Sequence, residues 1–153
     1  MPSCTPYHWP GTKIITFESL LIFLRLRLSL HISVARYGFH GASHQYVVTR
    51  LGSVLAPGAR LVSAHLGAGA SLAAAVTGEE ASRDTSMGFS PLSGLVMATR
   101  SGDIDPSVVP YISHQLQLSA DDVLNALNKQ SGFLGIAGTS DSRYALKVVL
   151  VDL

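Results

Sequence analysis

Residues 60–76, RLVSAHLGAGASLAAAV, place two apolar segments on either side of a short run rich in glycine. Residues 60–66 and 72–76 have the length and composition of strands, and the glycines between them are typical of a tight turn. Alanine favours helices, so residues 73–75 support the second strand less strongly. The stretch predicts a strand, a glycine turn and a second strand, near 60–66 and 71–77.

The flanking patterns predict an α/β domain. Residues 26–34 alternate between apolar and polar side chains, which predicts a half-buried strand. Apolar residues at helical spacing predict helices near 106–117 and 120–130, the first capped by Asp105-Pro106 and the second ended by Gly132. We therefore expect a mixed sheet with flanking helices.

The composition is that of a globular chain suited to a small anion. Of its 153 residues 47% are hydrophobic, and the only cysteine, Cys4, excludes an internal disulfide and fits a reducing cytoplasm. No acidic residue lies between Glu18 and Glu79, a segment that carries five arginines and four histidines. Arginines spread this thinly do not form the dense basic stripe that nucleic acid needs, so no nucleic-acid partner is expected.

The apolar run at residues 14–34 is the membrane candidate of the sequence. Glu18, Arg25 and Arg27 interrupt it, and each such charge costs roughly 2.5–3.5 kcal/mol at the centre of a bilayer. We therefore expect no transmembrane segment. A signal peptide is not expected either, because a basic leader and a small-residue cleavage site are both lacking.

Residues 36–44, RYGFHGASH, set His40 and His44 four positions apart. Such a pair chelates zinc on a helix, but Gly38 and Gly41 disfavour a helix here and a third ligand is not obvious. The simplest interpretation is two polar loop histidines, one packed against the core. His44 is accordingly assigned a structural role.

The motif HLGAGAS, residues 65–71, leaves two interpretations open. Residues 69–73 approach the G-x-S-x-G nucleophile elbow but lack its last glycine, and no lysine follows a glycine at Walker spacing. Glycines in a tight turn let backbone N–H groups face a phosphate, which a Cβ would hold away. The motif is thus either a phosphate-binding turn or a plain hairpin.

Further sequence motifs follow RYGFHGASH and HLGAGAS along the chain. RYGFHGASH, HLGAGAS, DTSMGFSPLSGLVMATRSGDIDP and SGFLGIAGTSDSR occur in this order, and together they resemble the acetate kinase family, which includes propionate and butyrate kinases. The match covers about residues 35–143. Residues 1–34 do not resemble the family, so we divide the chain into a divergent N-terminal segment, 1–34, and a partial nucleotide-binding domain, 35–153.

The resemblance implies a fold and a reaction. The fold is part of a ribonuclease H-like (actin-like ATPase) domain, here truncated, from a superfamily in which ATP lies between two similar domains. The reaction is ATP plus acetate, or a similar short carboxylate, giving ADP plus acetyl phosphate, with Mg²⁺. The resemblance also implies a cytoplasmic enzyme whose full-length members are homodimers.

The resemblance further implies roles for individual residues. His40 is the histidine that hydrogen-bonds the phosphoryl group in flight, and Arg100 holds the substrate carboxylate or the transferring phosphoryl group. The nucleotide and its phosphates are assigned to His65, Gly67, Ala68, Gly69, Ala70, Ser71, Asp141, Ser142 and Arg143. No residue is assigned to a metal, because Asp105 before Pro106 fits a helix cap better than a metal pair with Asp103.

The chain also departs from the family pattern. Ala68 stands where the family hairpin HLGNGAS has asparagine, which predicts weaker phosphate binding. The family's N-terminal phosphate motif, its acetate-pocket arginine, its FDTAFH segment and its GGIGEN adenine segment have no counterpart here. We therefore expect an acetate kinase-type chain that is incomplete by itself; the alternatives are an inactive truncated product and a non-catalytic nucleotide- or phosphate-binding module.

Overall fold

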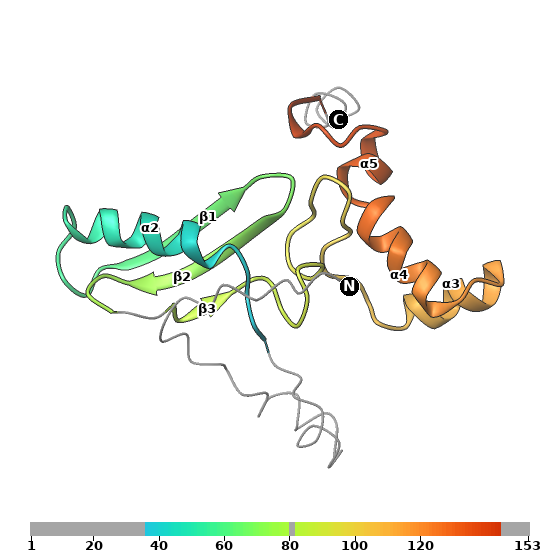
Figure 1. Ribbon diagram of the computed structural model, residues 1–153, viewed down its shortest axis with the longest axis horizontal. Coiled ribbons are helices and arrows are strands. Elements are labelled where there is room, and N and C mark those ends of the chain that lie inside the picture. The colour runs from blue at the N-terminus through green and yellow to red at the C-terminus, as the bar shows by residue number, and fades with distance from the viewer. Residues whose placement is uncertain (1–35, 80–81, 145–153) are drawn as a thin grey trace, which may run out of the picture. The chain divides into compact units, whose positions relative to one another are not determined.

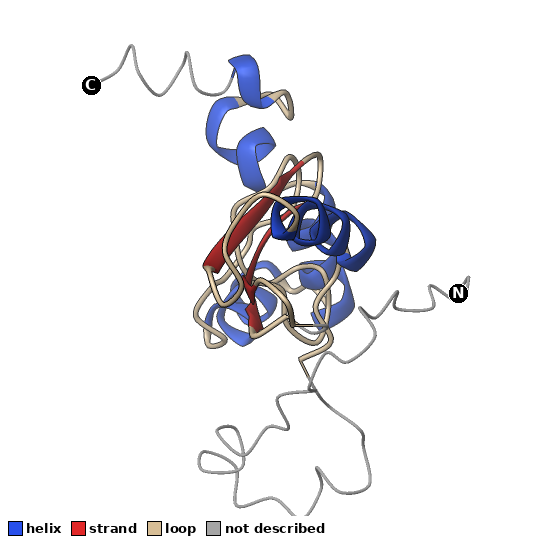
Figure 2. Ribbon diagram, turned by 90° about the vertical axis from the view of Figure 1, so that its left-hand side faces the viewer, coloured by secondary structure: helices blue, strands red, loops and turns tan. Residues whose placement is uncertain are grey.

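The computed structural model, shown in Figures 1 and 2, describes residues 36–79 and 82–144. These residues divide into two compact units. The described residues of the first unit are 36–65, 71–79 and 82–91, and those of the second unit are 66–70 and 92–144. The strand predicted at 26–34 and the segment 1–34 lie outside the described residues.

The first unit contains a three-stranded sheet, except for the strand-end residues Leu66 and Ala70, which belong to the second unit. Its strands are β1 (Arg60–Leu66), β2 (Ala70–Val76) and β3 (Asp84–Thr85), hydrogen-bonded in that order. The strand β3 runs antiparallel to β2, and β1 and β2 point in opposite directions on either side of the glycine turn (Figure 1). The two strands predicted from the sequence are confirmed, with the second starting at Ala70.

Helix α2, Gly41–Gly52, follows the RYGFH motif (Figure 1). The expectation that glycines disfavour a helix here was wrong. Gly38, with φ of 67°, lies before the helix, and Gly41 is its first residue, so neither interrupts it. Val48 of α2 packs with Ala75 and Leu61 into a small core, which fixes the helix against the sheet.

Alternation along β1 decides which side chains reach α2. Ser63 is buried, while Val62 and Leu66 remain 72% and 77% exposed.

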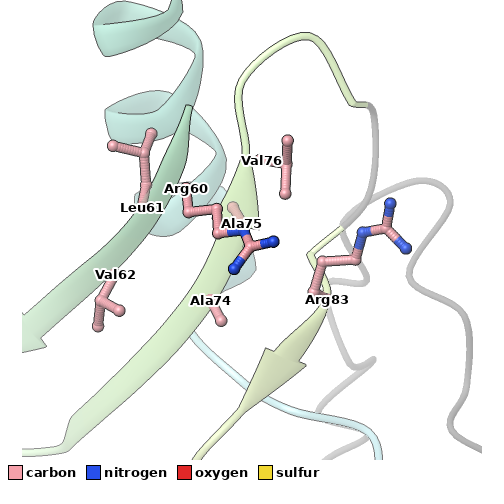
Figure 3. A pocket seen from close by; sticks show the side chains of 7 residues that line it. All are labelled: Arg60, Leu61, Val62, Ala74, Ala75, Val76 and Arg83. Carbon is pink, nitrogen blue, oxygen red and sulfur yellow. The ribbon is translucent and has the colours of Figure 1, made fainter. Parts of the chain in front are cut away.

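An open hollow of about 490 Å³ lies at the end of β1 and β2 away from the glycine turn (Figure 3). Its walls are mostly aliphatic, with Arg60 and Arg83 among them, and they carry no nucleophile or acid.

The second unit carries three helices among its described residues, α3 (Val108–Leu116), α4 (Ala120–Lys129) and α5 (Gly132–Ala137). The first two are the helices predicted near 106–117 and 120–130. No helix in the described part of the chain is long and apolar enough to cross a membrane.

Two predicted helix ends were wrong. The cap of α3 is Ser107 rather than Asp105, although Asp105 accepts hydrogen bonds from the amide and hydroxyl of Ser107 at 2.8 and 2.7 Å. Gly132 does not end α4, because it begins α5 with φ of 63°. Helix α4 starts in a capping box, in which Ser119 and Asp122 satisfy each other's backbone amides.

Candidate functional site

His40 has a backbone conformation that residues other than glycine rarely adopt. It is the N-cap of α2, with φ of 63° and ψ of 24°, and its side chain makes no capping hydrogen bond. Such conformations cost about 1–3 kcal/mol and gather at functional sites. The Nδ1 atom of His40 instead lies 2.9 Å from Oγ of Ser71 in β2. The strained backbone thus turns the ring toward the sheet.

The backbone before His40 is held by the segment that contains β3. The amide of Tyr37 donates to the carbonyl of Gly88 at 3.0 Å, and the Arg36 guanidinium donates to the carbonyl of Thr85 at 2.7 Å. A Cβ on Gly38 would come within 2.7 Å of Cγ2 of Thr85. The RYGFH and DTSMGF motifs are therefore packed against each other, and Gly38 permits the close approach.

Three histidines, His40, His44 and His65, form what we call the histidine cluster. The rings of His40 and His65 stack with centroids 4.0 Å apart and planes 15° apart, and His44 meets His65 edge-on at 6.3 Å. Oγ of Ser43 lies 3.0 Å from Nδ1 of His65. Because α2, its cap and β1 each supply one ring, the cluster depends on the packing of α2 on the sheet.

Two buried serines connect the cluster internally. Oγ of Ser71 lies 2.9 Å from Nδ1 of His40 and 2.8 Å from Nε2 of His44, and Oγ of Ser63 lies 3.0 Å from Nδ1 of His44. Ser71 is 0%, His44 2% and Ser63 5% exposed. Burial lowers the pKa of His44, and the nearby His65 lowers it further. His44 is therefore a neutral imidazole at pH 7.

The glycine turn, residues 67–69, belongs to the second unit. The Gly67 amide donates to the Gly69 carbonyl at 3.0 Å, and the Ala68 carbonyl accepts from the Ala98 amide at 3.2 Å. In the part of the chain that the structure describes, the amides of Ala68 and Gly69 donate no hydrogen bond. These two amides are the donors that the turn can offer to a phosphate. Ala70, at its far end, is buried.

Arg100 lies in a loop that backbone hydrogen bonds tie to α4 and α5. Carbonyls of Met97, Ala98 and Thr99 accept from the amides at the start of α5, at 2.9, 3.0 and 3.0 Å. The Arg100 side chain places Nη1 3.9 Å from Sδ of Met97. Because Ala98 also bonds Ala68, the glycine turn and the Arg100 loop are fixed to each other within this unit.

The residues predicted to contact adenosine form a local ion pair. The Arg143 guanidinium donates to both carboxylate oxygens of Asp141, at 2.9 Å from Nε and 2.5 Å from Nη2. These bonds and the Arg143 amide lower the pKa of Asp141 to about 2. Ser142 between them is exposed. The segment thus presents a paired carboxylate and an exposed hydroxyl.

The structure brings the predicted site residues together in two groups. His40, His65 and Ser71 meet in the first unit, and Ala68 meets the Arg100 loop in the second. The prediction that His40 and Arg100 face one cleft joins residues of different units and stays a prediction.

Sequence reasoning did not identify the residues that organise the histidine cluster. His44 was assigned a merely structural role, and Ser43 and Ser63 were not singled out. The signal for Ser63 was the period of two in β1, which puts it on the same face as His65. The signal for His44 was its spacing of four residues from His40 once α2 is recognised as a helix.

Residues 12–150 match the model of the acetokinase family, beyond both ends of the region covered by the motifs. The acetate kinase of Bacillus subtilis (strain 168) is 54% identical over 126 residues, which cover 80% of this chain and 31% of that protein. The acetate kinase of Geobacillus sp. (strain WCH70) is 48% identical over 126 residues, with the same coverage.

Solved structures of an acetate kinase and a propionate kinase also match this chain. The crystal structure of Porphyromonas gingivalis acetate kinase matches with a TM-score of 0.75 and 38% identity, covering 84% of this chain and 33% of that one. A propionate kinase from Francisella tularensis subsp. tularensis SCHU S4 matches with a TM-score of 0.74 and 46% identity, covering 81% and 32%. The chain therefore spans about a third of the length of the relatives it matches.

Proposed function

The chain belongs to the acetokinase family, and from that premise we propose that it carries the phosphate-binding part of a kinase that transfers a phosphoryl group from ATP to acetate or a similar short carboxylate. The products are ADP and acetyl phosphate. We place this activity in the cytoplasm and extend to it the homodimeric state expected of full-length members.

One observation carries the proposal. His40 comes from RYGFHGASH and Ser71 from HLGAGAS, and the two side chains are hydrogen-bonded at 2.9 Å. Two motifs that are far apart in the sequence thus meet at the histidine assigned to the phosphoryl group. Ser71 also lies only two positions after Gly69, whose amide is available to a phosphate.

In this proposal each predicted site residue has a role in transferring the charged phosphoryl group. His40 donates a hydrogen bond to the transferring phosphoryl oxygens, and Arg100 neutralises their charge or that of the carboxylate. The amides of Ala68 and Gly69 bind the nucleotide phosphates, and the Asp141–Arg143 segment lies against adenosine. Phosphoryl transfer relies on positioning and charge neutralisation more than on covalent chemistry, so donors of these kinds suit it.

Asp103 and Asp105, the carboxylates considered for the Mg²⁺ that the family implies, each make local hydrogen bonds. Oδ1 of Asp103 accepts from the Gly94 amide at 2.7 Å, and Oδ1 of Asp105 accepts from both donors of Ser107. No group of three or more His, Cys, Asp or Glu among the described residues is placed to hold a metal ion. Neither carboxylate is therefore assigned to Mg²⁺.

Nucleotide titration by calorimetry tests the proposal. The chain should bind ATP and ADP, and Ala68→Asn should tighten binding about tenfold, because a hydrogen bond to a charged group contributes about 1.5–3 kcal/mol. Ala64→Asn is the matched control, since Ala64 is exposed on β1 outside the turn. The proposal is wrong if nucleotide does not bind, or if both variants change affinity equally.

A second candidate is a nucleotide-binding module without turnover, because the amides of Ala68 and Gly69 could bind a phosphate by themselves. A hydroxamate assay with acetate, ATP and Mg²⁺, run beside a full-length relative, separates the two. Acetyl phosphate formed by the pure chain supports the kinase, and binding without product supports the module.

A further inference from the structure

Four side chains form a continuous line of hydrogen bonds through the histidine cluster, which we call the serine–histidine relay. It runs from Ser63 to His44 at 3.0 Å, from His44 to Ser71 at 2.8 Å, and from Ser71 to His40 at 2.9 Å. The first three members are at most 5% exposed, so the bonds among them are formed away from solvent.

Counting protons restricts how the relay is arranged. The Ser71 hydroxyl has one proton and two nitrogen neighbours, so it donates to one and accepts from the other. His44 is neutral because burial lowers its pKa, and a neutral ring carries one proton on one nitrogen. It therefore also donates at one nitrogen and accepts at the other. All hydrogen bonds of the relay must point in the same direction.

Ser63 decides between the two directions. If the relay starts at Ser63, its hydroxyl proton goes to Nδ1 of His44 and every proton in the line has an acceptor. In the reverse direction the Ser63 hydroxyl accepts, and its own proton needs another partner. The Ser63 hydroxyl makes no second side-chain hydrogen bond within the described residues, and the side chain is buried. The first direction is therefore favoured, because buried donors are nearly always satisfied.

We propose that the serine–histidine relay holds the ring proton of His40 on Nε2, so that Ser63, His44 and Ser71 are positioning residues for His40. Its consequence for catalysis rests on the proposed function: an N–H at Nε2 attracts a phosphoryl oxygen, whereas a bare nitrogen there repels it. The side chain of Ser71 then acts on the phosphate through His40.

The tautomers can be measured directly on the whole chain with ¹⁵N-labelled histidines. Two-bond ¹H–¹⁵N correlation spectra at pH 7.5 should show His40 and His44 both protonated on Nε2 and bare on Nδ1. Ser71→Ala should convert His40 to a mixture of tautomers. Ser71→Thr, which retains the hydroxyl, should restore the single form. A proton on Nδ1 of either histidine in the unmutated chain would overturn the proposal.

Ser43→Ala is the matched control. It also removes one serine–histidine hydrogen bond of 3.0 Å, but this bond goes to His65, outside the relay. The tautomer of His40 should not change in this variant. If Ser43→Ala and Ser63→Ala disturb His40 equally, the effect passes through the stacked His65 ring and the relay is refuted.

A second variant and a separate binding measurement distinguish the remaining outcomes. Should Ser71→Ala not fold, Ser63→Ala at the other end of the relay tests the same direction, because losing its donor must release the tautomer of His44. The proposed function is judged separately, by nucleotide titration. Correct tautomers without nucleotide binding leave the relay standing and refute the function, and the opposite result refutes the relay alone.

Discussion

Replacing Gly132 by alanine tests how the Arg100 loop is held. Gly132 has φ of 63°, and a Cβ there would stand 2.1 Å from the carbonyl oxygen of Met97 and 2.6 Å from that of Arg100. Both neighbours are backbone atoms, which cannot rotate away as a side chain would. The hydrogen bonds from Ser131 to Thr99 and from Phe133 to Met97 lie on either side and hold the contact closed.

Gly138, at the other end of α5, separates the two components of the effect. Its φ is 67°, but a Cβ there would meet nothing within 4 Å. Gly138→Ala should therefore cost only the left-handed conformation, about 1–2 kcal/mol. Gly132→Ala should add an overpacking penalty of about 1–3 kcal/mol. With a typical urea m-value of about 2 kcal/mol/M, an extra 2 kcal/mol lowers the unfolding midpoint by about 1 M.

Urea unfolding followed by circular dichroism measures both variants against the unmutated chain. The reasoning is refuted if the two substitutions lower the midpoint equally, because the close approach at Gly132 would then contribute nothing. Titration of acetate or ATP with the folded Gly132→Ala protein should also show weakened binding if Arg100 contacts either ligand, whereas Gly138→Ala should leave affinity unchanged.

Two further predictions concern stability. The pKa of His44 is lowered from its ordinary value of 6.5 in the folded chain. Below about pH 6.5 the unfolded chain therefore binds a proton more readily than the folded chain does. The free energy of unfolding should be at its full value above about pH 6.5 and should fall as the pH drops below it. The fall in urea midpoint between pH 7.5 and 5.5 should be smaller in His44→Gln, and an equal fall would contradict the assignment of the effect to His44. Ser119→Ala should lower the free energy of unfolding by about 1 kcal/mol by removing the capping box of α4. Ser107→Ala, at a cap without a side-chain capping bond, should lower it less in the same urea titration, and equal losses would contradict the capping argument.

Local sequence patterns predicted the helices and strands that are determined by residues close together in the sequence. The glycine turn and the strands on either side of it were predictable at residues 60–76, because the length and composition of each apolar run and the glycines between them are local features. The same holds for α4, where Ser119 and Asp122 mark the start of the helix. Both features place a backbone segment without help from distant residues.

The start of α2 and the role of Gly132 were not predictable in this way. Gly41 belongs to a helix because Val48 packs on Ala75 and Leu61, contacts that glycine propensity does not report. Gly132 has a left-handed φ because the loop of Met97 closes over it. In both cases tertiary packing outweighs the local preference. The role of each glycine therefore depended on a neighbour far away in the sequence.

The two units hold their predicted site residues in place by different means. In the first unit, side-chain hydrogen bonds from Ser71 and Ser63 orient the histidines, so the identity of each side chain determines the geometry. In the second, backbone hydrogen bonds join Ala68 to Ala98, and Gly132 permits the loop to close, so backbone contacts determine the geometry of the loop. With alanine at position 68 the turn accordingly keeps its backbone hydrogen bonds. Substitutions in the relay should change the tautomers of His40 and His44, whereas substitutions at Gly132 should change stability first.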